Sequence, residues 1–368
     1  MNMEDKIKNF TPSWFSINMG TGIIAILLYN FPFLHNYVKY LSLGVFSLNV
    51  IMFIMFSVVT IIRYVKFPQI FNLMLSHLQQ SLFIGTLPMG LTTITNYLIM
   101  LNYTNLAHML WWIEFVLTIV SCILVPYYII VIHEHRLETI NATLLLPIVP
   151  AIVTAASGGL LAQNLYLSDN IFFANFILFI SFALVGPGIL LALSIITIYL
   201  YRLIIHSLPQ REIIISVFLP LGPLGQGSYA FMQLGKSFNL IVKDSYIDGL
   251  GNSVYSFTFL IAILLWGYGA WYLTIALLSL FVTYSAGIPF NMGWWGLIFP
   301  MGVYTAATLS IATTINYFPL KIIASVSVCL LFMLWIVVGY KTCSDILSGK
   351  LFYAPCLTPY QRDSTSDS

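Results

Sequence analysis

The sequence predicts an all-α polytopic membrane protein with ten transmembrane helices, arranged as five helical hairpins around a central pore that the odd-numbered helices line. The class follows from composition, because 60% of the 368 residues are hydrophobic and only 7% are charged, against about 25% charged residues in a soluble domain. The mean hydropathy of +0.93 leaves too little polar surface for a water-soluble body. The hairpins and the pore follow from the positions of glycine and proline.

Ten apolar segments can be drawn, and about 20 residues suffice for one crossing of a membrane. Their approximate bounds are 13–31, 38–62, 82–101, 108–132, 144–163, 171–201, 213–235, 252–284, 292–315 and 320–342. The sixth and eighth are long, which predicts tilted or protruding helices. We expect one ten-helix transport domain over 12–345, between a cytoplasmic N-terminal tail (1–11) and a polar, disordered cytoplasmic C-terminal tail (346–368).

The basic residues predict the orientation, because loops that stay in the cytoplasm carry an excess of Lys and Arg. With the N-terminus in the cytoplasm, four fall on the outer side, namely Lys39, Lys236, Lys243 and Lys321. Ten fall on the cytoplasmic side, namely Lys6, Lys8, Arg63, Lys66, Arg136, Arg202, Arg211, Lys341, Lys350 and Arg362. This asymmetry predicts an even number of spans and two cytoplasmic termini.

Glycine and proline mark the odd-numbered spans at sites about 60 to 80 residues apart, which is the length of one helical hairpin. The expected helix breaks are Gly22, Pro88, Pro150, Pro220, Pro223 and Pro300. Irregular backbone is tolerated at membrane depth only inside protein or beside a water-filled cavity, so the broken helices belong on the inside of a ring. The alternative is that glycine and proline are simply frequent in membrane helices, where small residues mediate packing.

The polar residues of the odd-numbered spans are neutral, and no Lys or Arg falls at the centre of a span. The candidate pore-lining residues are Asn18, Thr21, Thr86, Thr92, Asn96, Ser157, Gln226 and Thr305. A small anion would meet hydroxyls, amides and freed backbone N–H groups at the helix breaks. Each hydroxyl can instead bond to the backbone of its own helix.

The ninth span contains the string WWGLIFPMG, residues 294–302. Pro300 cannot donate to the helix ladder, so the backbone beside Phe299 lacks a regular partner. A large ring at such a break can plug a pore, which makes Phe299 a candidate gate. The alternative is that Phe299 packs like most of the 27 phenylalanines.

Glu114 is the one acidic residue placed within a span, on the fourth. A carboxyl inside a membrane is costly and is a functional candidate by default. Burial favours its neutral form, so Glu114 is a candidate for proton coupling. The alternative is a protonated carboxyl that bonds to a neighbouring helix near the outer surface.

Other kinds of site find little support. The four cysteines lack C-x-x-C spacing and predict neither a disulfide framework nor a zinc site. The string His133-Glu134-His135-Arg136 is not H-E-x-x-H and predicts a solvated loop. Dispersed basic residues give no reason to expect a nucleic-acid partner. No catalytic motif is present, so we expect no enzyme activity, no cofactor and no metal.

Four long strings carry a resemblance to a known family: PSWFSINMGTGI (12–23), SLFIGTLPMG (81–90), LLPIVPAIVTAASGG (145–159) and LPLGPLGQGSY (219–229). With them the chain resembles the tellurite-resistance/dicarboxylate transporters, most closely the fungal sulfite efflux pumps, over nearly its whole length. The resemblance implies ten helices in five hairpins, and a gating phenylalanine on the ninth helix that corresponds to Phe299. It also implies a homo-oligomer, with a trimer expected.

The expected function is therefore a multi-pass plasma-membrane exporter of sulfite or hydrogensulfite, with the lipid bilayer and a small inorganic anion as its partners. One alternative is a C4-dicarboxylate (malate) permease or a slow-type anion channel of the same family. A dicarboxylate needs two anchoring sites, and no central arginine offers one. A membrane-embedded enzyme or receptor would require a clustered catalytic set or a long ligand-binding loop.

Overall fold

A computed structural model describes residues 2–134, 136–242, 247–285 and 287–357. Throughout these ranges the regular structure is helical and no strand occurs, so the predicted all-α class is confirmed. His135, Lys243, Arg362 and the tail from residue 358 onwards, all assigned above to loops or tails, lie outside the described residues.

Buried and outward-facing helices alternate along the chain. The buried ones, called the inner helices, are α2 (Phe15–Tyr29), α6 (Thr86–Met100), α8 (Val149–Leu167), α10 (Leu221–Ile241) and α12 (Trp295–Thr314). Each is followed by an outer helix, and these are α3 (His35–Lys66), α7 (Thr104–Val131), α9 (Ile171–His206), α11 (Leu250–Tyr284) and α13 (Phe318–Leu347). In the most apolar stretch of Pro12–Tyr29, 83% of the residues are buried, against 22% in that of Asn36–Lys66.

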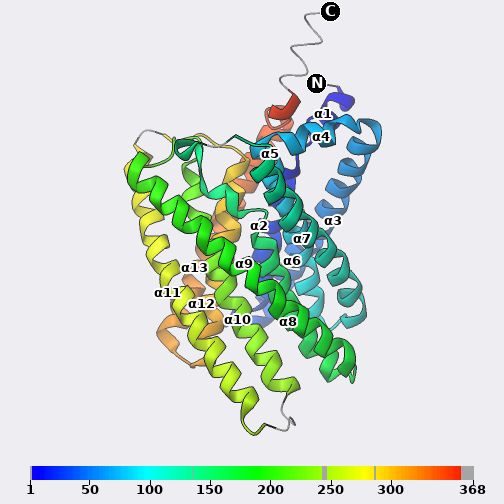
Figure 1. The fold of residues 1–368 in the computed structure, drawn as a ribbon, viewed down its shortest axis with the longest axis vertical. Coiled ribbons are helices and arrows are strands. Elements are labelled where there is room, and N and C mark those ends of the chain that lie inside the picture. The colour runs from blue at the N-terminus through cyan, green and yellow to red at the C-terminus, as the bar shows by residue number, and fades with distance from the viewer. Residues whose placement is uncertain (1, 135, 243–246, 286, 358–368) are drawn as a thin grey trace, which may run out of the picture.

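The inner helices contact one another in a closed circle. Helix α2 packs against α6, α6 against α8, α8 against α10, α10 against α12, and α12 against α2. Each outer helix packs on the inner helix that precedes it and also on the next inner helix around the circle. In Figure 1 the chain runs down each inner helix and returns along the outer one, so all inner helices begin at the same end of the molecule.

A glycine lies at each contact of the circle. A Cβ atom added to any of them would come within 3.2 Å of the neighbouring inner segment, and they are Gly22 (facing Thr93), Gly85 (Leu146), Gly159 (Leu234), Gly225 (Tyr304) and Gly302 (Ile23). Small residues allow membrane helices to approach closely and gain van der Waals contact. These glycines therefore permit close packing. Gly22 lies inside α2, which continues past it without interruption.

Every inner helix is preceded by a short 3₁₀ helix. The five are η1 (Pro12–Trp14), η2 (Phe83–Gly85), η4 (Ala142–Leu145), η5 (Ile214–Phe218) and η6 (Met292–Trp294). Their carbonyl groups accept hydrogen bonds from the first N–H groups of the α-helix where the two elements adjoin, as at Phe15 and Trp295.

The prolines lie near helix starts, which differs from the expected breaks in mid-span. Pro88 and Pro223 lie in the first turn of α6 and α10, Pro150 is the second residue of α8, and Pro220 precedes α10. The first N–H groups of a helix need no partner within it, so proline is tolerated there. Pro300 lies in the second turn of α12, which runs on to Thr314.

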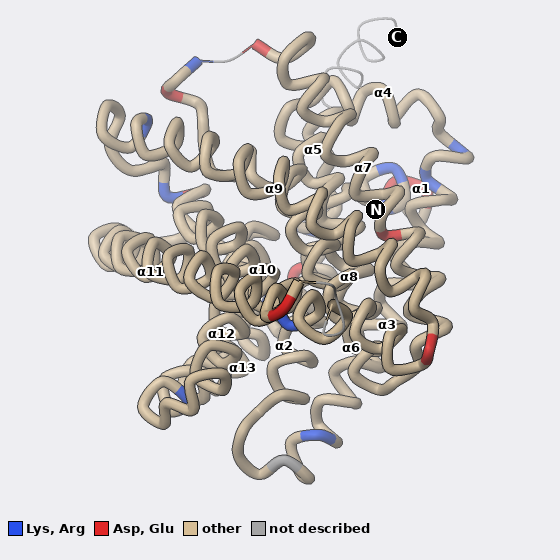
Figure 2. Tube along the Cα trace, turned by 60° about the horizontal axis from the view of Figure 1, so that its bottom comes forward, with Lys and Arg blue, Asp and Glu red and all other residues tan. Residues whose placement is uncertain are grey.

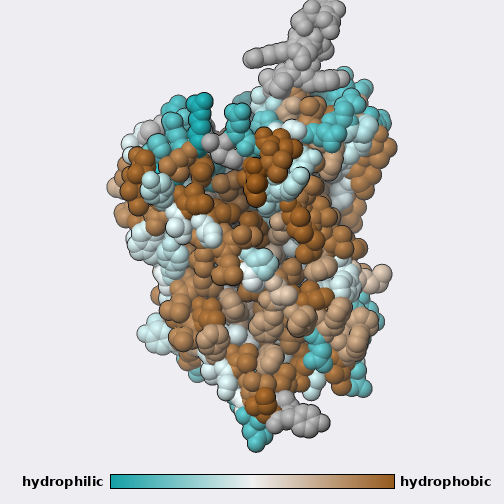
Figure 3. Space-filling view, in the orientation of Figure 1, coloured by the Kyte–Doolittle hydropathy of each residue, from teal (hydrophilic) through white to brown (hydrophobic). Residues whose placement is uncertain are grey.

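The outer surface identifies a membrane protein. Figure 3 shows a broad apolar band between polar ends, and charged residues along the helices are few in Figure 2. Eight helical segments of the described chain are long and apolar enough to cross a membrane. Helices α8 and α10, with 19 and 21 residues, are not among the eight. Their glycines and polar residues lower their hydropathy.

The two ends of the described chain lie together. Short helices α1 (Met3–Lys8), α4 (Gln69–Ser76) and α5 (Leu78–Leu82) lie at the end of the molecule where the inner helices begin (Figure 1). The backbone N–H of Ala354, just before η7 (Pro355–Leu357), donates to Asn9 Oδ1 at 2.9 Å. The rings of Trp14 and Phe352 are 5.3 Å apart. Adjacent ends agree with an even number of crossings. The remaining short helix, η3 (Leu137–Thr139), follows α7.

Candidate functional site

Three cavities follow one another between the inner helices. The first, called the vestibule, has a volume of about 200 Å³ and lies where these helices begin. The second, the narrow cavity, measures about 20 Å³, enough for only one or two water molecules. The third, the distal cavity, measures about 370 Å³ and lies toward the helix ends. Phe299 borders the vestibule and the narrow cavity, while Ile26, Tyr229 and Ala306 border the narrow and distal cavities.

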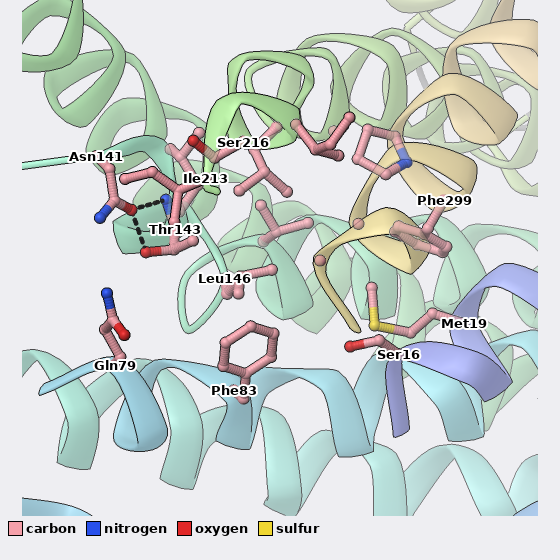
Figure 4. A pocket seen from close by; sticks show the side chains of 18 of the residues that line it. Ser16, Met19, Gln79, Phe83, Asn141, Thr143, Leu146, Ile213, Ser216 and Phe299 are labelled. Carbon is pink, nitrogen blue, oxygen red and sulfur yellow. Dashed lines mark hydrogen bonds between the residues drawn. The ribbon is translucent and has the colours of Figure 1, made fainter. Parts of the chain in front are cut away.

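The beginnings of all five inner helices line the vestibule. Their residues there are Ser16, Met19, Met89, Val149, Gly222, Gly296, Phe299 and Pro300. In Figure 4 Phe299, Met19 and Ser16 lie on one side of the cavity, and Gln79, Asn141 and Thr143 lie on the other. Asn141 Oδ1 accepts a hydrogen bond from the Thr143 backbone N–H at 2.9 Å. We call the side with Gln79, Asn141 and Thr143 the mouth, which is polar, and the side with Phe299 and Met19 the floor, which is apolar apart from Ser16.

Phe299 forms the boundary between the two cavities. Its side chain is 2% exposed, and Ile23, Val153 and Val303 line the narrow cavity beside it. Among the described residues, no other aromatic ring stacks on Phe299 or contacts its edge. The ring thus borders a cavity on two sides, which is compatible with a swing about its side-chain torsions.

The narrow cavity offers hydrogen-bond donors without charge. Asn96 and Gln226 line it, and within the described chain their side chains have no hydrogen-bond partner. Thr92 and Thr93 also line it, but their hydroxyls donate to the Pro88 and Gly90 carbonyls at 2.9 and 2.8 Å. The two amides, not the hydroxyls, are therefore the groups free to donate to an anion.

The other candidate pore-lining residues lie outside the narrow cavity. Asn18 donates to Asn49 Oδ1 at 3.0 Å, Thr86 to the Pro12 carbonyl at 3.0 Å, and Thr305 to the Met301 carbonyl at 2.8 Å. Thr21 accepts from Trp335 Nε1 at 3.1 Å and borders a lateral apolar groove. Ser157 is buried, with no hydrogen-bond partner for its hydroxyl. The contacts of Asn18, Thr86 and Thr21 join an inner helix to a neighbouring segment, whereas the Thr305 bond lies within α12.

Sequence reasoning missed most of the polar lining of the distal cavity. Asn30, Gln233, Lys236, Ser310 and Thr313 line it. Lys236 was assigned to an outer loop, but it lies on α10 and is half-buried. The signal was available in the sequence of α10, since Gln226, Tyr229, Gln233 and Lys236 recur at spacings of three and four residues, which place them on one face of a helix.

Glu114 lies on α7 behind the wall of the narrow cavity. Its side chain is fully buried, and the hydroxyls of Thr92, Thr154 and Thr95 face its carboxyl. Neither carboxyl oxygen makes a hydrogen bond of normal geometry. The Thr92 and Thr95 hydroxyls donate to backbone carbonyls instead. A carboxylate would lack donors here, whereas a protonated carboxyl can donate to a threonine oxygen.

The mouth of the vestibule carries an exposed ion pair. Glu212 borders the cavity, and Arg211 Nε lies 3.1 Å from Glu212 Oε1. The pKa of the Glu212 carboxyl is lowered, chiefly by a hydrogen bond from the Glu212 backbone N–H and to a smaller extent by the hydrogen bond from Arg211. The pair leaves the mouth without net charge. His133, which belongs to the string predicted to form a solvated loop, lies near α4 at the same end of the molecule, with its Nε2 atom 3.1 Å from the Leu75 carbonyl oxygen.

The fold and the cavities define a multi-pass helical membrane protein with a row of cavities through a circle of buried helices. The chain belongs to the voltage-dependent anion channel family, whose model matches residues 9–343. The family resemblance inferred from the sequence, that of the tellurite-resistance/dicarboxylate transporters, is confirmed.

Individual relatives are transporters. The chain is 37% identical to the sulfite efflux pump of Trichophyton rubrum over 93% of each protein. It is 28% identical to an uncharacterised transporter of Methanocaldococcus jannaschii, over 95% of this chain and 98% of that protein. It is 22% identical to the malic acid transport protein of Schizosaccharomyces pombe, over 95% of this chain and 82% of that protein. These relatives support an anion transporter, and none of their names describes an enzyme.

Proposed function

We propose that the protein exports sulfite or hydrogensulfite across the plasma membrane, through a neutral pore that Phe299 gates. The observation that carries this proposal is the row of cavities. The beginnings of all five inner helices line the vestibule, Phe299 closes its floor, and free amides follow in the narrow cavity. The name of the sulfite efflux pump that shares 37% identity with this chain supports sulfite as the substrate.

Parallel helices give the pathway its preference for anions. Each helix N-terminus carries a partial charge of about half a positive elementary charge, and all five inner helices point this end at the vestibule (Figure 1). Beyond Phe299, Asn96 and Gln226 replace part of the hydration shell without holding the anion tightly. An electrically negative cytoplasm favours exit by about 2.3 kcal/mol per charge for each 100 mV.

In this proposal all ten long helices cross the membrane and the inner five line the pore. The contact between Asn9 and Ala354 supports two termini on one side, and the excess of Lys and Arg in the loops there supports a cytoplasmic side. We further propose one pore in each subunit of a homotrimer, as the family resemblance implies.

Glu114 is the proposed proton-coupling residue. Thr92 joins it to the pathway, because this residue faces the carboxyl and also lines the narrow cavity. A proton released from Glu114 would leave a negative charge one side chain away from the passing anion. Its protonation would therefore govern the ease of anion passage.

A malate permease is the second candidate, because the malic acid transport protein matches most of this chain. The narrow cavity, with a volume of about 20 Å³, would have to widen less for a small inorganic anion than for a C4-dicarboxylate. No basic residue lines the narrow cavity to anchor a second carboxylate. A slow-type anion channel would share the pathway but would pass nitrate and chloride as readily as sulfite.

Anion flux into proteoliposomes tests the proposal. The purified full-length protein is reconstituted, and the uptake of sulfite, malate, nitrate and chloride is compared under one membrane potential. Sulfite should pass fastest and malate slowest. Faster malate flux would establish the permease, and equal flux of the three inorganic anions would establish the channel. If no anion passed, the proposed function would be wrong.

A further inference from the structure

We propose that Gln233, Lys236 and Ser310 form a binding site for a small oxyanion in the distal cavity, a site that the anion occupies after it has passed Phe299. The role of the site in transport rests on the proposed function. The binding of an anion there does not, because it follows from the chemistry of the cavity.

Donors without partners converge on this cavity. Lys236 offers an ammonium group, Gln233 an amide and Ser310 a hydroxyl, and all three line the cavity. Within the described part of the chain, none of these three side chains has a hydrogen-bond or ion-pair partner. Lys236 is the one charged residue among those that line the narrow and distal cavities. An oxyanion accepts hydrogen bonds from just these kinds of group.

The donors continue a stripe along α10. Gln226 and Tyr229 line the narrow cavity, and Tyr229, Gln233 and Lys236 line the distal cavity. Residues three and four positions apart lie on one face of a helix, so this face points along the pathway from Phe299 outwards. An anion that leaves Gln226 thus reaches Gln233 and Lys236 next.

The polarity of the inner helices explains why a positive charge is needed at this site. The distal cavity lies near the ends of inner helices, where Asn30 caps α2 and Met100 ends α6. Helix C-termini carry a partial negative charge, which would repel an anion at this point. The ammonium group of Lys236 offsets that charge, and a cation near a helix C-terminus is itself stabilised.

Substitution of Lys236 tests the site by transport. Sulfite flux through proteoliposomes is measured against sulfite concentration for the wild type, Lys236→Met, Lys236→Arg and Lys321→Met. Lys236→Met should raise the half-saturating concentration about tenfold, since it removes the charged donor. Lys236→Arg should stay within about twofold of the wild type. Lys321 is the matched control, because it bonds to Asn316 and does not line the cavity.

Binding is measured separately, so that the site can fail independently of the proposed function. Sulfite that binds the folded protein should raise its melting temperature in detergent. The rise should occur in the wild type and in Lys321→Met, and should be lost in Lys236→Met. Equal stabilisation of wild type and Lys236→Met, or none in the wild type, would overturn the site. A wild type that binds sulfite at Lys236 but passes no anion would overturn the transport function and leave the site standing.

The positive charge at position 236 can also be restored by chemical modification. Lys236→Cys is treated with a cationic or an anionic thiosulfonate reagent, and the wild type, which retains its own cysteines, receives the same treatment. The cationic adduct should bring the half-saturating sulfite concentration back toward the wild-type value, while the anionic adduct should raise it further. Adducts of either charge that act alike would show that charge at this position does not bind the anion.

Discussion

Gly22 of α2 lies directly against Thr93 of α6, so that a Cβ atom on Gly22 would be 1.9 Å from Thr93 Oγ1. Thr93 lines the narrow cavity, and its hydroxyl is held by Asn49 Nδ2 at 3.1 Å and by the Gly90 carbonyl at 2.8 Å. The side chain has little freedom to retreat. The width of the narrow cavity therefore depends on the close approach of α2 and α6 at Gly22.

Gly22→Ala should destabilise the protein by about 1–3 kcal/mol, because the new methyl group overpacks a tight contact. The melting temperature in detergent measures this effect. Gly44→Ala on α3 is the matched control, because no atom beyond the adjoining backbone of its own helix lies within 4 Å of the added Cβ. The control should be neutral or stabilising, as alanine favours a helix over glycine. Equal melting temperatures for the two variants would contradict the tight contact.

Phe299→Ala should increase anion flux per molecule and weaken selectivity between sulfite and chloride. The ring is an apolar obstacle, and partial dehydration of an anion without compensation costs several kcal/mol. Flux in proteoliposomes is normalised to the amount of reconstituted protein. If Phe299 only packed, truncation would instead cost about 3–5 kcal/mol of stability and would lower the flux.

Phe332→Ala serves as the control for that experiment. Phe332 lies on the outer helix α13, where its ring stacks on Trp335 at 5.7 Å and borders none of the three cavities. The control should lose stability without a gain in flux. Unchanged or lower flux in Phe299→Ala would rule out the gate.

Glu114→Gln should abolish the dependence of transport on a pH gradient while flux continues. Glutamine keeps the shape of the protonated carboxyl among Thr92, Thr95 and Thr154, but it cannot release a proton. Sulfite flux is measured with and without a pH gradient, and surface expression is determined in parallel. A variant that responds to the pH gradient as the wild type does would assign Glu114 a structural role.

The orientation predicts which sites are accessible from outside the cell. Asp169 lies between α8 and α9, at the end opposite the vestibule, and Arg211 lies beside the vestibule. In Asp169→Cys the new thiol should react with an impermeant reagent in intact cells, and in Arg211→Cys only after permeabilisation. Asn102 and Asn141 each begin an N-x-T glycosylation sequence. Asn141 is on the proposed cytoplasmic side and should remain unglycosylated, while Asn102 is on the outer side but too near the membrane to be a dependable acceptor. The reverse labelling pattern would invert the proposed topology.

The composition was sufficient to predict an all-α membrane protein, and four long sequence strings carried the resemblance to its family. Hydropathy is a property of each segment by itself, because every helix that crosses a bilayer must satisfy its own backbone. The roles of particular residues in those segments could not be predicted from the hydropathy of each segment alone. Pro150 and Pro220 look like breaks within a continuous apolar run, but a 3₁₀ helix precedes each α-helix and places them at its start.

Tertiary structure decided which side chains reach the pathway. Thr92, Asn96 and Gln226 line the narrow cavity, while Asn18, Thr21 and Thr305 do not. An inner helix is surrounded by protein on every side, so its residues show no apolar stripe that would mark one face as the pore. The sequence by itself determined that these helices are buried, because their composition and spacing are local properties. Only the packing of the circle determined which face points inward, and it brought Lys236 from an apparent loop to the wall of the distal cavity.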